Sequence, residues 1–345
     1  MHKVDVISLY GTVNAGVRAR ALTWLERLGL DHQLHSYFEG GAAGLGVFAR
    51  SPGRAARSER QLRALAERRP DTLFLRREAT PLGRGQLEDR LLRSSRHGVY
   101  DIDDALYHDV RSWAFERLFS KGATAARAAA AADVVIVGNS YLAEWASALN
   151  DEVRIVPTCV EPDDYRTKRS YDIADEPRLV WLGTPSGERY LADIAPALQR
   201  LHSEHGARVT IVGSVQEQLG ELEAVIHRVP WSLPHVHNAI STYDIGLMPL
   251  RNTPYERGKC AYKLLEYGAA GLPSVASPVG ANASILQEAG APAPRTNDDW
   301  YQALARLLTA PSVERAQLGA RLHDVVAAGY SFARHESAWR TAVVP

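Results

Sequence analysis

Two lysines and a glutamate stand out in the stretch "GKCAYKLLEYGAAGLP" at residues 258–273. Lys259, Lys263 and Glu266 follow one another at intervals of four and three residues. On a helix they would fall within roughly 60° of one another and share one face about 10 Å long. Two ammonium groups near a helix N-terminus could hold a diphosphate, and a deeper carboxylate could accept hydrogen bonds from a ribose diol. The alternative is a solvated helix face with a Lys263–Glu266 ion pair.

Two polar loops in the first half of the chain could add to such a site. The loop in "LYGTVNAGVRAR" (9–20) offers Gly16 for close approach of a phosphate and Arg18 or Arg20 as a cation. A tight turn and solvated arginines explain it as well. "GVYDIDDALYHD" (98–109) brings together three acids that could contact sugar hydroxyls, cap a helix or, less well, bind a metal. They are Asp101, Asp103 and Asp104.

Two loops in the second half are further candidates. "WLGTPSGERYL" (181–191) supplies the hydroxyls of Thr184 and Ser186 and a flexible Gly187 where a phosphate is expected, although capping explains Ser186 nearly as well. Trp231 in "HRVPWSLPHVHNAI" (227–240) could stack on a flat base or simply pack. His235 and His237 would point away from each other on a helix, so we expect no metal pair there.

The elements that must position these loops are short apolar strands alternating with helices. Strands are expected at 4–11, 72–77, 98–102, 133–140, 153–158, 178–183, 208–213, 224–230, 243–250 and 273–279. Helical patterns occupy 16–30, 188–203, 260–270 and 300–309. Apolar strands joined by helices predict parallel sheets covered on both faces. We therefore expect an α/β protein with two doubly wound, Rossmann-like domains facing a cleft, with ligands beyond the carboxyl ends of the strands.

A Pro- and charge-rich stretch in mid-chain sets the predicted domain boundaries. They are 1–160 for an N-terminal Rossmann-like domain, 161–177 for a linker, 178–330 for a C-terminal domain and 331–345 for a terminal helix.

Composition limits the possible partners. The 345 residues carry a formal net charge of +0, which argues against a nucleic-acid partner. The two cysteines, Cys159 and Cys260, are too few and too far apart for a disulfide framework or a zinc site. No run of about 18 apolar residues and no signal peptide is evident, so we expect a cytoplasmic protein. Residues 50–96 hold 13 Arg against 6 acids, and could touch anionic lipid or form a solvated face.

The segment at 243–282, "YDIGLMPL…ERGKCAYKLLEYGAAGLPSVASPVGAN", resembles the donor-binding region of the retaining nucleotide-sugar glycosyltransferases of family four. These enzymes have the GT-B fold, and the likeness is closest to a bacterial branch with GKC-x-x-K. "VYDIDDALY" (99–107), "ADVVIVGNSYLAEWA" (132–146) and "VRIVPTCVEPDDY" (153–165) agree with it. The likeness covers most of residues 98–330. It implies that 1–160 is the acceptor-side domain and that 178–330 is the nucleotide-sugar-binding domain.

The resemblance implies transfer of a hexose-type sugar from a UDP- or GDP-sugar to an unidentified acceptor, with retention of anomeric configuration. The acceptor would be a small molecule or a glycan- or lipid-linked one, and no metal or other cofactor is obligatory. Carried over by position, the resemblance assigns donor contacts to Gly16, Tyr262, Lys263, Glu266, Gly280 and Asn282.

Two departures concern the charges of the site. The family usually has an acid eight residues before the position of Glu266, with seven residues between the two acids. The residue at that position here is Gly258, and Glu256 stands two residues earlier as a candidate sugar or acceptor contact. The usual Arg/Lys pair after the first strand of the second domain is reduced to Arg189. We predict that Lys259 and Lys263 supply the catalytic charge. The alternatives are an inactive nucleotide-sugar-binding subunit and an epimerase or hydrolase on the same fold.

Overall fold

The computed structural model describes residues 3–12, 14–38, 52–108, 119–213 and 219–345. The chain forms two compact units. Unit 1 comprises Met1–Thr158, Arg257–Cys260 and His335–Pro345, and unit 2 comprises Cys159–Glu256 and Ala261–Arg334. The chain therefore changes unit after Thr158, Glu256, Cys260 and Arg334. None of the described helices is long and apolar enough to cross a membrane.

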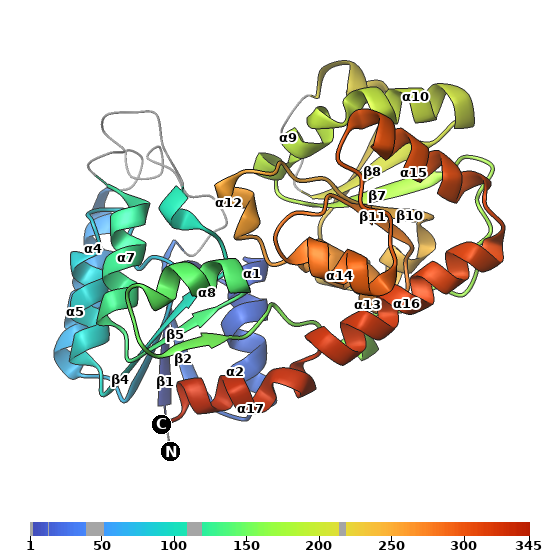
Figure 1. Cartoon of the computed structure of the whole chain (residues 1–345). Helices are drawn as coiled ribbons and strands as arrows, with labels where there is room; N and C mark the ends of the chain where they lie inside the picture. Colours follow the sequence, from blue (N-terminus) through green and yellow to red (C-terminus); the bar gives the residue numbers. More distant parts are fainter. Residues whose placement is uncertain (1–2, 13, 39–51, 109–118, 214–218) are drawn as a thin grey trace. The chain divides into compact units, whose positions relative to one another are not determined.

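In its described part, unit 1 is built on a six-stranded parallel sheet in the order β2-β1-β3-β4-β5-β6 (Figure 1). The strands are β1 (Lys3–Tyr10), β2 (Asp31–Phe38), β3 (Thr72–Arg76), β4 (His97–Ile102), β5 (Val134–Val137) and β6 (Val153–Ile155). The sequence pattern did not predict β2, because its stretch "DHQLHSYF" mixes polar and apolar residues. This strand pairs only with β1, at the sheet edge, where polar residues are tolerated.

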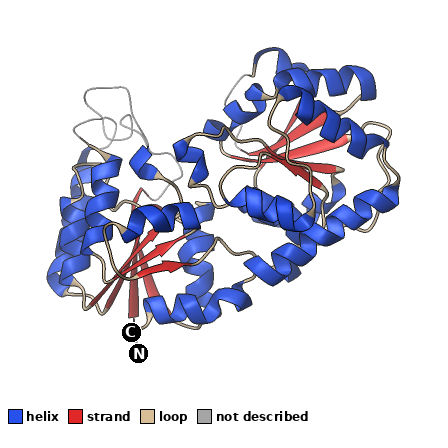
Figure 2. Ribbon diagram, in the orientation of Figure 1, coloured by secondary structure: helices blue, strands red, loops and turns tan. Residues whose placement is uncertain are grey.

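Helices cover both faces of the sheet in unit 1 (Figure 2). One core lies under α4 (Pro52–Arg68), α5 (Gln86–Ser94), α7 (Lys121–Ala131) and α8 (Ser140–Ser147). The helix expected at 16–30 runs from Ala15 to Arg27 as α1 (Ala15–Val17), a π-helical turn (Arg18–Leu22) and α2 (Thr23–Arg27). A short 3-10 helix spans Leu106–His108. The C-terminal α17 (Phe332–Val343) packs Trp339 on Trp24, with ring centroids 5.4 Å apart.

The described part of unit 2 contains a five-stranded parallel sheet in the order β11-β10-β7-β8-β9 (Figure 1). Its strands are β7 (Arg178–Gly183), β8 (Arg208–Gly213), β9 (Ile226–Pro230), β10 (Ile245–Met248) and β11 (Ser274–Ala276). Its longer helices are α9 (Pro185–Asp193), α10 (Ala195–His205), α13 (Tyr262–Ala269), α14 (Ala281–Ala289), α15 (Asn297–Thr309) and α16 (Ser312–Tyr330). Its shorter ones are α11 (Leu233–Ala239), α12 (Pro254–Arg257) and 3-10 turns at Pro162–Asp164, Gly220–Val225 and Ile240–Thr242.

The prediction of two doubly wound parallel-sheet domains is confirmed. Residues 161–177, expected as a linker, belong to unit 2, where the Lys168 N–H donates to the carbonyl of Ala270 at 2.8 Å. The terminal helix expected at 331–345 corresponds to α17. From His335 onward it belongs to unit 1.

Candidate active site

The expected three-residue stripe on one helix is wrong for Lys259. Helix α13 begins at Tyr262, so Lys259 precedes it and belongs to unit 1. Ala261 is the reason, because its φ of 57° lies in the left-handed region and a right-handed helix cannot continue back through it. Lys263 and Glu266 do lie on α13, one turn apart.

Lys263 lies over an aromatic ring, whereas Glu266 is buried and accepts a hydrogen bond. Lys263 Nζ lies 5.3 Å from the centroid of the Trp181 ring, a cation–π contact on a half-buried lysine. Glu266 is only 5% exposed, and the Tyr165 hydroxyl donates to its Oε1 at 3.5 Å. Burial, followed by the charge of Glu266, raises the pKa of Tyr165 well above its usual value, so this hydroxyl keeps its proton. Glu266 is thus a buried acceptor one turn into the helix.

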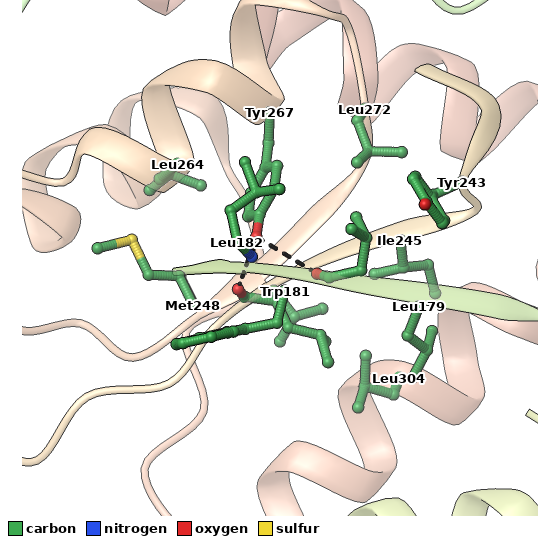
Figure 3. Close-up of a cluster of buried hydrophobic side chains, with 14 of the residues drawn as sticks. Leu179, Trp181, Leu182, Tyr243, Ile245, Met248, Leu264, Tyr267, Leu272 and Leu304 are labelled. Carbon is green, nitrogen blue, oxygen red and sulfur yellow. Dashed lines mark hydrogen bonds between the residues drawn. The ribbon is translucent and has the colours of Figure 1, made fainter. Parts of the chain in front are cut away.

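Tyr267 fixes α13 on the sheet (Figure 3). Its hydroxyl accepts the N–H of Leu182 at 3.1 Å and lies 3.1 Å from the Leu247 carbonyl and 3.3 Å from that of Val180. In β7, Leu179 and Val180 are the residues that pair with β10. Beyond them, the Tyr267 hydroxyl connects the two strands through Leu182 and Leu247. The position of α13 is therefore set by a buried polar contact as well as by apolar packing.

The loop after β7 enters α9 at Pro185, with Thr184 at the N-cap position. The Thr184 and Ser186 hydroxyls are 3.2 Å apart, and Ser186 lies inside the helix, so it is not the capping residue. Gly187 is the residue expected to make this loop flexible. This residue is helical, and a Cβ there would lie 3.1 Å from Trp181 Cζ2, so its small size makes room for the indole.

The loop before α14 contains Gly280 and Asn282. Gly280 has φ 57° and ψ −137°, a conformation that favours glycine. Asn282 is fully buried and its Nδ2 donates to the Ser277 carbonyl at 3.1 Å. Its Oδ1 has no hydrogen-bond partner among the described residues, which leaves a buried acceptor in the first turn of α14.

Trp231 is half-buried and packs one part of its surface against the core of unit 2. His235 and His237 lie on α11 and face different tyrosines. His235 Nε2 is 3.4 Å from the Tyr243 hydroxyl, and the His237 ring is 4.7 Å from that of Tyr165. In the described ranges, no three His, Cys, Asp or Glu residues gather closely enough to hold a metal ion.

Glu256 is 3% exposed and already engaged by other side chains. The Tyr190 hydroxyl donates to its Oε1 at 2.7 Å, the Thr253 hydroxyl donates to Oε2, and Arg189 Nη2 lies 3.6 Å from Oε1. These contacts tie α12 to α9. Glu256 is therefore held as a buried acceptor within unit 2.

In unit 1, Gly16 lies against an arginine that the sequence analysis did not single out. A Cβ at Gly16 would collide with the Arg76 guanidinium. A larger residue at position 16 would therefore have to displace that guanidinium. Arg18 Nη1 donates to the Thr12 carbonyl at 2.8 Å.

Arg20 and Asp101 form a buried ion pair, 2% and 0% exposed, with Nη2 of the arginine 2.5 Å from Oδ1 of the acid. Arg20 Nη1 also donates to the Val156 carbonyl at 2.6 Å. Burial lowers the pKa of Arg20, but the charge and hydrogen bond of Asp101 outweigh it and the pKa lies above its usual value. This pair is a structural contact in the interior of unit 1.

Asp103 and Asp104 form ion pairs with two arginines. Arg76 Nη2 lies 2.7 Å from Asp103, Arg77 Nε lies 2.5 Å from Asp103, and Arg77 Nη2 donates to Asp104. Burial raises the pKa of Asp103, but the charges of the two arginines outweigh it and hold the pKa well below its usual range. Lys259 Nζ lies 3.5 Å from Asp104 Oδ1.

Sequence reasoning missed Arg76 and Arg77, which directly follow the apolar run of β3. Their place at the carboxyl end of a strand was the available signal. The φ of 59° at Arg77 was not readable, since this left-handed conformation is unusual for a residue other than glycine. It lets one guanidinium reach both Asp103 and Asp104.

Each unit carries a parallel sheet covered by helices, and the chain has the two Rossmann-like domains of the GT-B fold. Residues 176–310 match the family described as glycosyl transferases group 1. No curated protein matches this sequence.

Solved structures share the fold at low sequence identity. Sucrose-phosphate synthase from Thermosynechococcus elongatus has 13% identity and a TM-score of 0.75, over 99% of this chain and 98% of that one. WaaG, a glycosyltransferase involved in lipopolysaccharide biosynthesis, has 15% identity and a TM-score of 0.66 over 100% of both chains. Anabaena HepE, in complex with UDP and glucose, has 13% identity and a TM-score of 0.66 over 99% and 100%. The family match and the shared fold together support a glycosyltransferase.

Proposed function

We propose that this protein transfers a hexose-type sugar from a nucleoside diphosphate sugar to an acceptor, with retention of anomeric configuration. The observation that carries the proposal is α13, which starts beside Lys263, has Glu266 buried one turn on, and lies inside the segment matching the glycosyl transferases group 1. HepE, which shares the fold, is solved with UDP and glucose.

In the proposed donor site, the first-turn amides of Tyr262 and Lys263 bind the distal phosphate, where the helix dipole favours negative charge. Lys263 adds a charge, and Glu266 accepts hydrogen bonds from the ribose. The remaining assigned donor contacts in unit 2 are Thr184, Ser186, Gly280 and Asn282, with Trp231 as a candidate for base stacking. Each is an expectation from the sequence.

The proposed chemistry is positioning and stabilisation of the departing diphosphate, without a metal or other cofactor. Lys259 and Lys263 supply the positive charge that the reduced Arg/Lys pair lacks. Gly16 is a further donor contact that the resemblance assigns. The candidates for sugar or acceptor contacts are Arg18, Asp103, Asp104 and Glu256, whereas Asp101 is enclosed in its ion pair with Arg20. The donors are expected to be UDP- or GDP-sugars.

The test combines binding and transfer. UDP-glucose, GDP-mannose and dTDP-glucose are screened by thermal shift, since a ligand that binds the native state raises its melting temperature. The stabilising donor is then incubated with a panel of sugars and lipid-linked sugars. Release of nucleoside diphosphate that depends on the acceptor supports transfer, and NMR of the product's anomeric proton reports retention.

Substitution of the lysines tests the assigned charges. Lys259→Ala should lower turnover by at least about 10²-fold, as loss of one preorganised charge contact typically does. Near-normal turnover would remove Lys259 from the mechanism. Donor consumption without an acceptor would instead favour a hydrolase or epimerase, and donor binding with no turnover on any acceptor would favour an inactive binding subunit.

A further inference from the structure

The segment Gly258–Cys260 occupies an unusual place in the chain. The chain enters it from unit 2 at Glu256 and returns to unit 2 at Ala261, yet the segment itself belongs to unit 1. It ends two residues before α13. What holds it in unit 1 therefore decides where Lys259 lies.

Asn139 is the side chain that grips this segment. Its Nδ2 donates to the carbonyl of Gly258 at 3.0 Å and to that of Lys259 at 3.2 Å. Its Oδ1 accepts the N–H of Leu142 at 3.0 Å and so caps α8. The amide nitrogen thus binds the segment and the amide oxygen caps α8, so only Oδ1 is needed for the cap.

Two glycines make the fit close. A Cβ on Gly258 would lie 2.5 Å from the Ala105 backbone nitrogen, and a Cβ on Gly138 would collide with Cys260 Sγ. The Cys260 thiol donates to the Asp103 carbonyl at 3.2 Å, and the residue is 8% exposed. Burial raises the pKa of this thiol, which keeps the proton that it donates. Residues 138–140 and residues 258–260 therefore fit closely against each other.

The ammonium group that this segment carries has an acid beside it. Lys259 Nζ lies 3.5 Å from Asp104, whose other oxygen accepts from Arg77. The main chain of the segment is held by Asn139 and the side chain is oriented by Asp104. Backbone and ammonium group are thus fixed by two separate contacts.

We propose that Asn139 is a positioning residue, whose amide nitrogen fixes Gly258–Cys260 on unit 1 and thereby places the Lys259 ammonium group for sugar transfer. The proposal rests on the proposed function for its catalytic part. Its structural part, that Asn139 holds the segment, stands on the contacts alone. The two parts can be tested separately.

Asn139→Asp is the discriminating variant. It keeps an oxygen for the Leu142 N–H, and aspartate is as good an N-cap as asparagine. It removes both donors and places a carboxylate against two carbonyl oxygens. Asn150→Asp is the matched control in the same unit. Asn150 also donates to two carbonyls, those of Ala129 and Ala132, and accepts the Glu152 N–H.

The first readout is maleimide labelling of the cysteines, resolved by peptide mass mapping. Cys260 should label at least about tenfold faster in Asn139→Asp than in the wild type, because its thiol is buried only while the segment is held. Cys159, 1% exposed in unit 2, is the internal control, since general unfolding would expose both thiols. Asn150→Asp should leave Cys260 labelling unchanged. An unchanged Cys260 rate in Asn139→Asp overturns the proposal.

The second readout is transfer kinetics. Asn139→Asp should lower kcat on the order of tenfold and leave the donor KM within about threefold, the pattern for an interaction made in the transition state. Faster Cys260 labelling with wild-type kcat would overturn the positioning role. If Asn139→Asp fails to fold, Gly258→Ala displaces the same segment from the other side and should give the same two results.

Failure of the proposed function has a different signature. A wild-type protein that transfers no sugar with any donor and acceptor would end the catalytic part. The labelling rates would still decide whether Asn139 holds the segment.

Discussion

Glu88 is a buried acid in unit 1 whose charge is only partly compensated. It is 0% exposed, and its Oε1 accepts the N–H groups of Ala79 and Thr80 at 3.0 and 3.3 Å. Its Oε2 has no hydrogen-bond partner among the described residues, and neither does the nearby Tyr100 hydroxyl. Burial raises the pKa of Glu88 to about 7, although the backbone N–H groups oppose the shift. The folded state therefore binds this proton more tightly than the unfolded chain.

This shift makes stability depend on pH in a defined direction. The folded pKa is about 7 against an ordinary 4.5, so the contribution of Glu88 is complete below pH 4.5 and is lost as pH rises toward 7 and above. Glu88→Gln mimics the protonated acid and keeps the oxygen that holds Ala79 and Thr80. We expect the variant to exceed the wild type in unfolding free energy by on the order of 2–3 kcal/mol at pH 8.

Urea unfolding at pH 5 and pH 8 measures the difference. At pH 5 the two proteins should differ by less than about 1 kcal/mol, because this pH lies only slightly above the ordinary pKa of 4.5. Equal stabilities at both pH values would show that Glu88 titrates normally.

Residue types at strand ends could be predicted better than their roles. The acids Asp101, Asp103 and Asp104 were recognised, but whether they bind arginine, a sugar or a helix terminus depends on residues more than 20 positions away. Arg20 reaches Asp101 over 81 positions and Arg76 reaches Asp103 over 27. No local pattern encodes such pairs.

At the scale of elements, strand positions were predicted well because buried parallel strands are continuous apolar runs. β7 and β8 match the expected bounds, 178–183 and 208–213. The start of α13 was harder to predict from the sequence. The pattern favoured a helix from residue 260, whereas the helix begins at Tyr262, after the left-handed Ala261. Cys260 belongs to unit 1 and Tyr262 to unit 2. The spacing of apolar residues does not predict a backbone conformation that tertiary contacts impose.

The C-terminal helix has a docking site that its sequence did not reveal. Trp339 is 1% exposed, stacks on Trp24 with an interplanar angle of 7°, and lies 5.9 Å from the Phe74 ring. The Ala342 carbonyl is 2.9 Å from His97 Nε2, and the Val343 carbonyl accepts the Thr72 hydroxyl at 3.3 Å. The last helix therefore completes one face of unit 1.

Truncating this tryptophan should destabilise unit 1. We expect Trp339→Ala to cost about 3–5 kcal/mol in unfolding free energy, because a large aromatic side chain leaves a cavity against Trp24 and Phe74. Urea unfolding followed by tryptophan fluorescence measures the loss. Arg340→Ala, at an exposed neighbouring position, is the control and should stay within about 0.5 kcal/mol of the wild type. A small effect of Trp339→Ala would mean that the helix is dispensable.

At the scale of the molecule, a net charge of +0 hides an uneven distribution. Within the Arg-rich segment, residues 50 and 51 lie outside the described ranges, and α4 carries exposed arginines along its length. They are Arg54, Arg57, Arg60, Arg63 and Arg68. Glu59 lies 3.8 Å from Arg63 and Glu67 lies 3.3 Å from Arg90, so acids offset part of this charge. The face is either a solvated surface or a contact for anionic lipid.

Vesicle binding decides between these alternatives. If α4 contacts lipid, the protein should sediment with vesicles of phosphatidylserine and phosphatidylcholine and not with phosphatidylcholine alone. Each arginine near such a surface contributes about 1 kcal/mol, so Arg57→Glu with Arg60→Glu should lower partitioning at least about tenfold. Arg166→Glu with Arg169→Glu makes the same charge change at exposed positions of unit 2 and should have little effect. Raising the salt from about 0.1 M to 1 M shortens the screening length from about 10 Å to about 3 Å and should release the protein. Equal binding to both kinds of vesicle, or indifference to the α4 substitutions, would leave α4 as a solvated face.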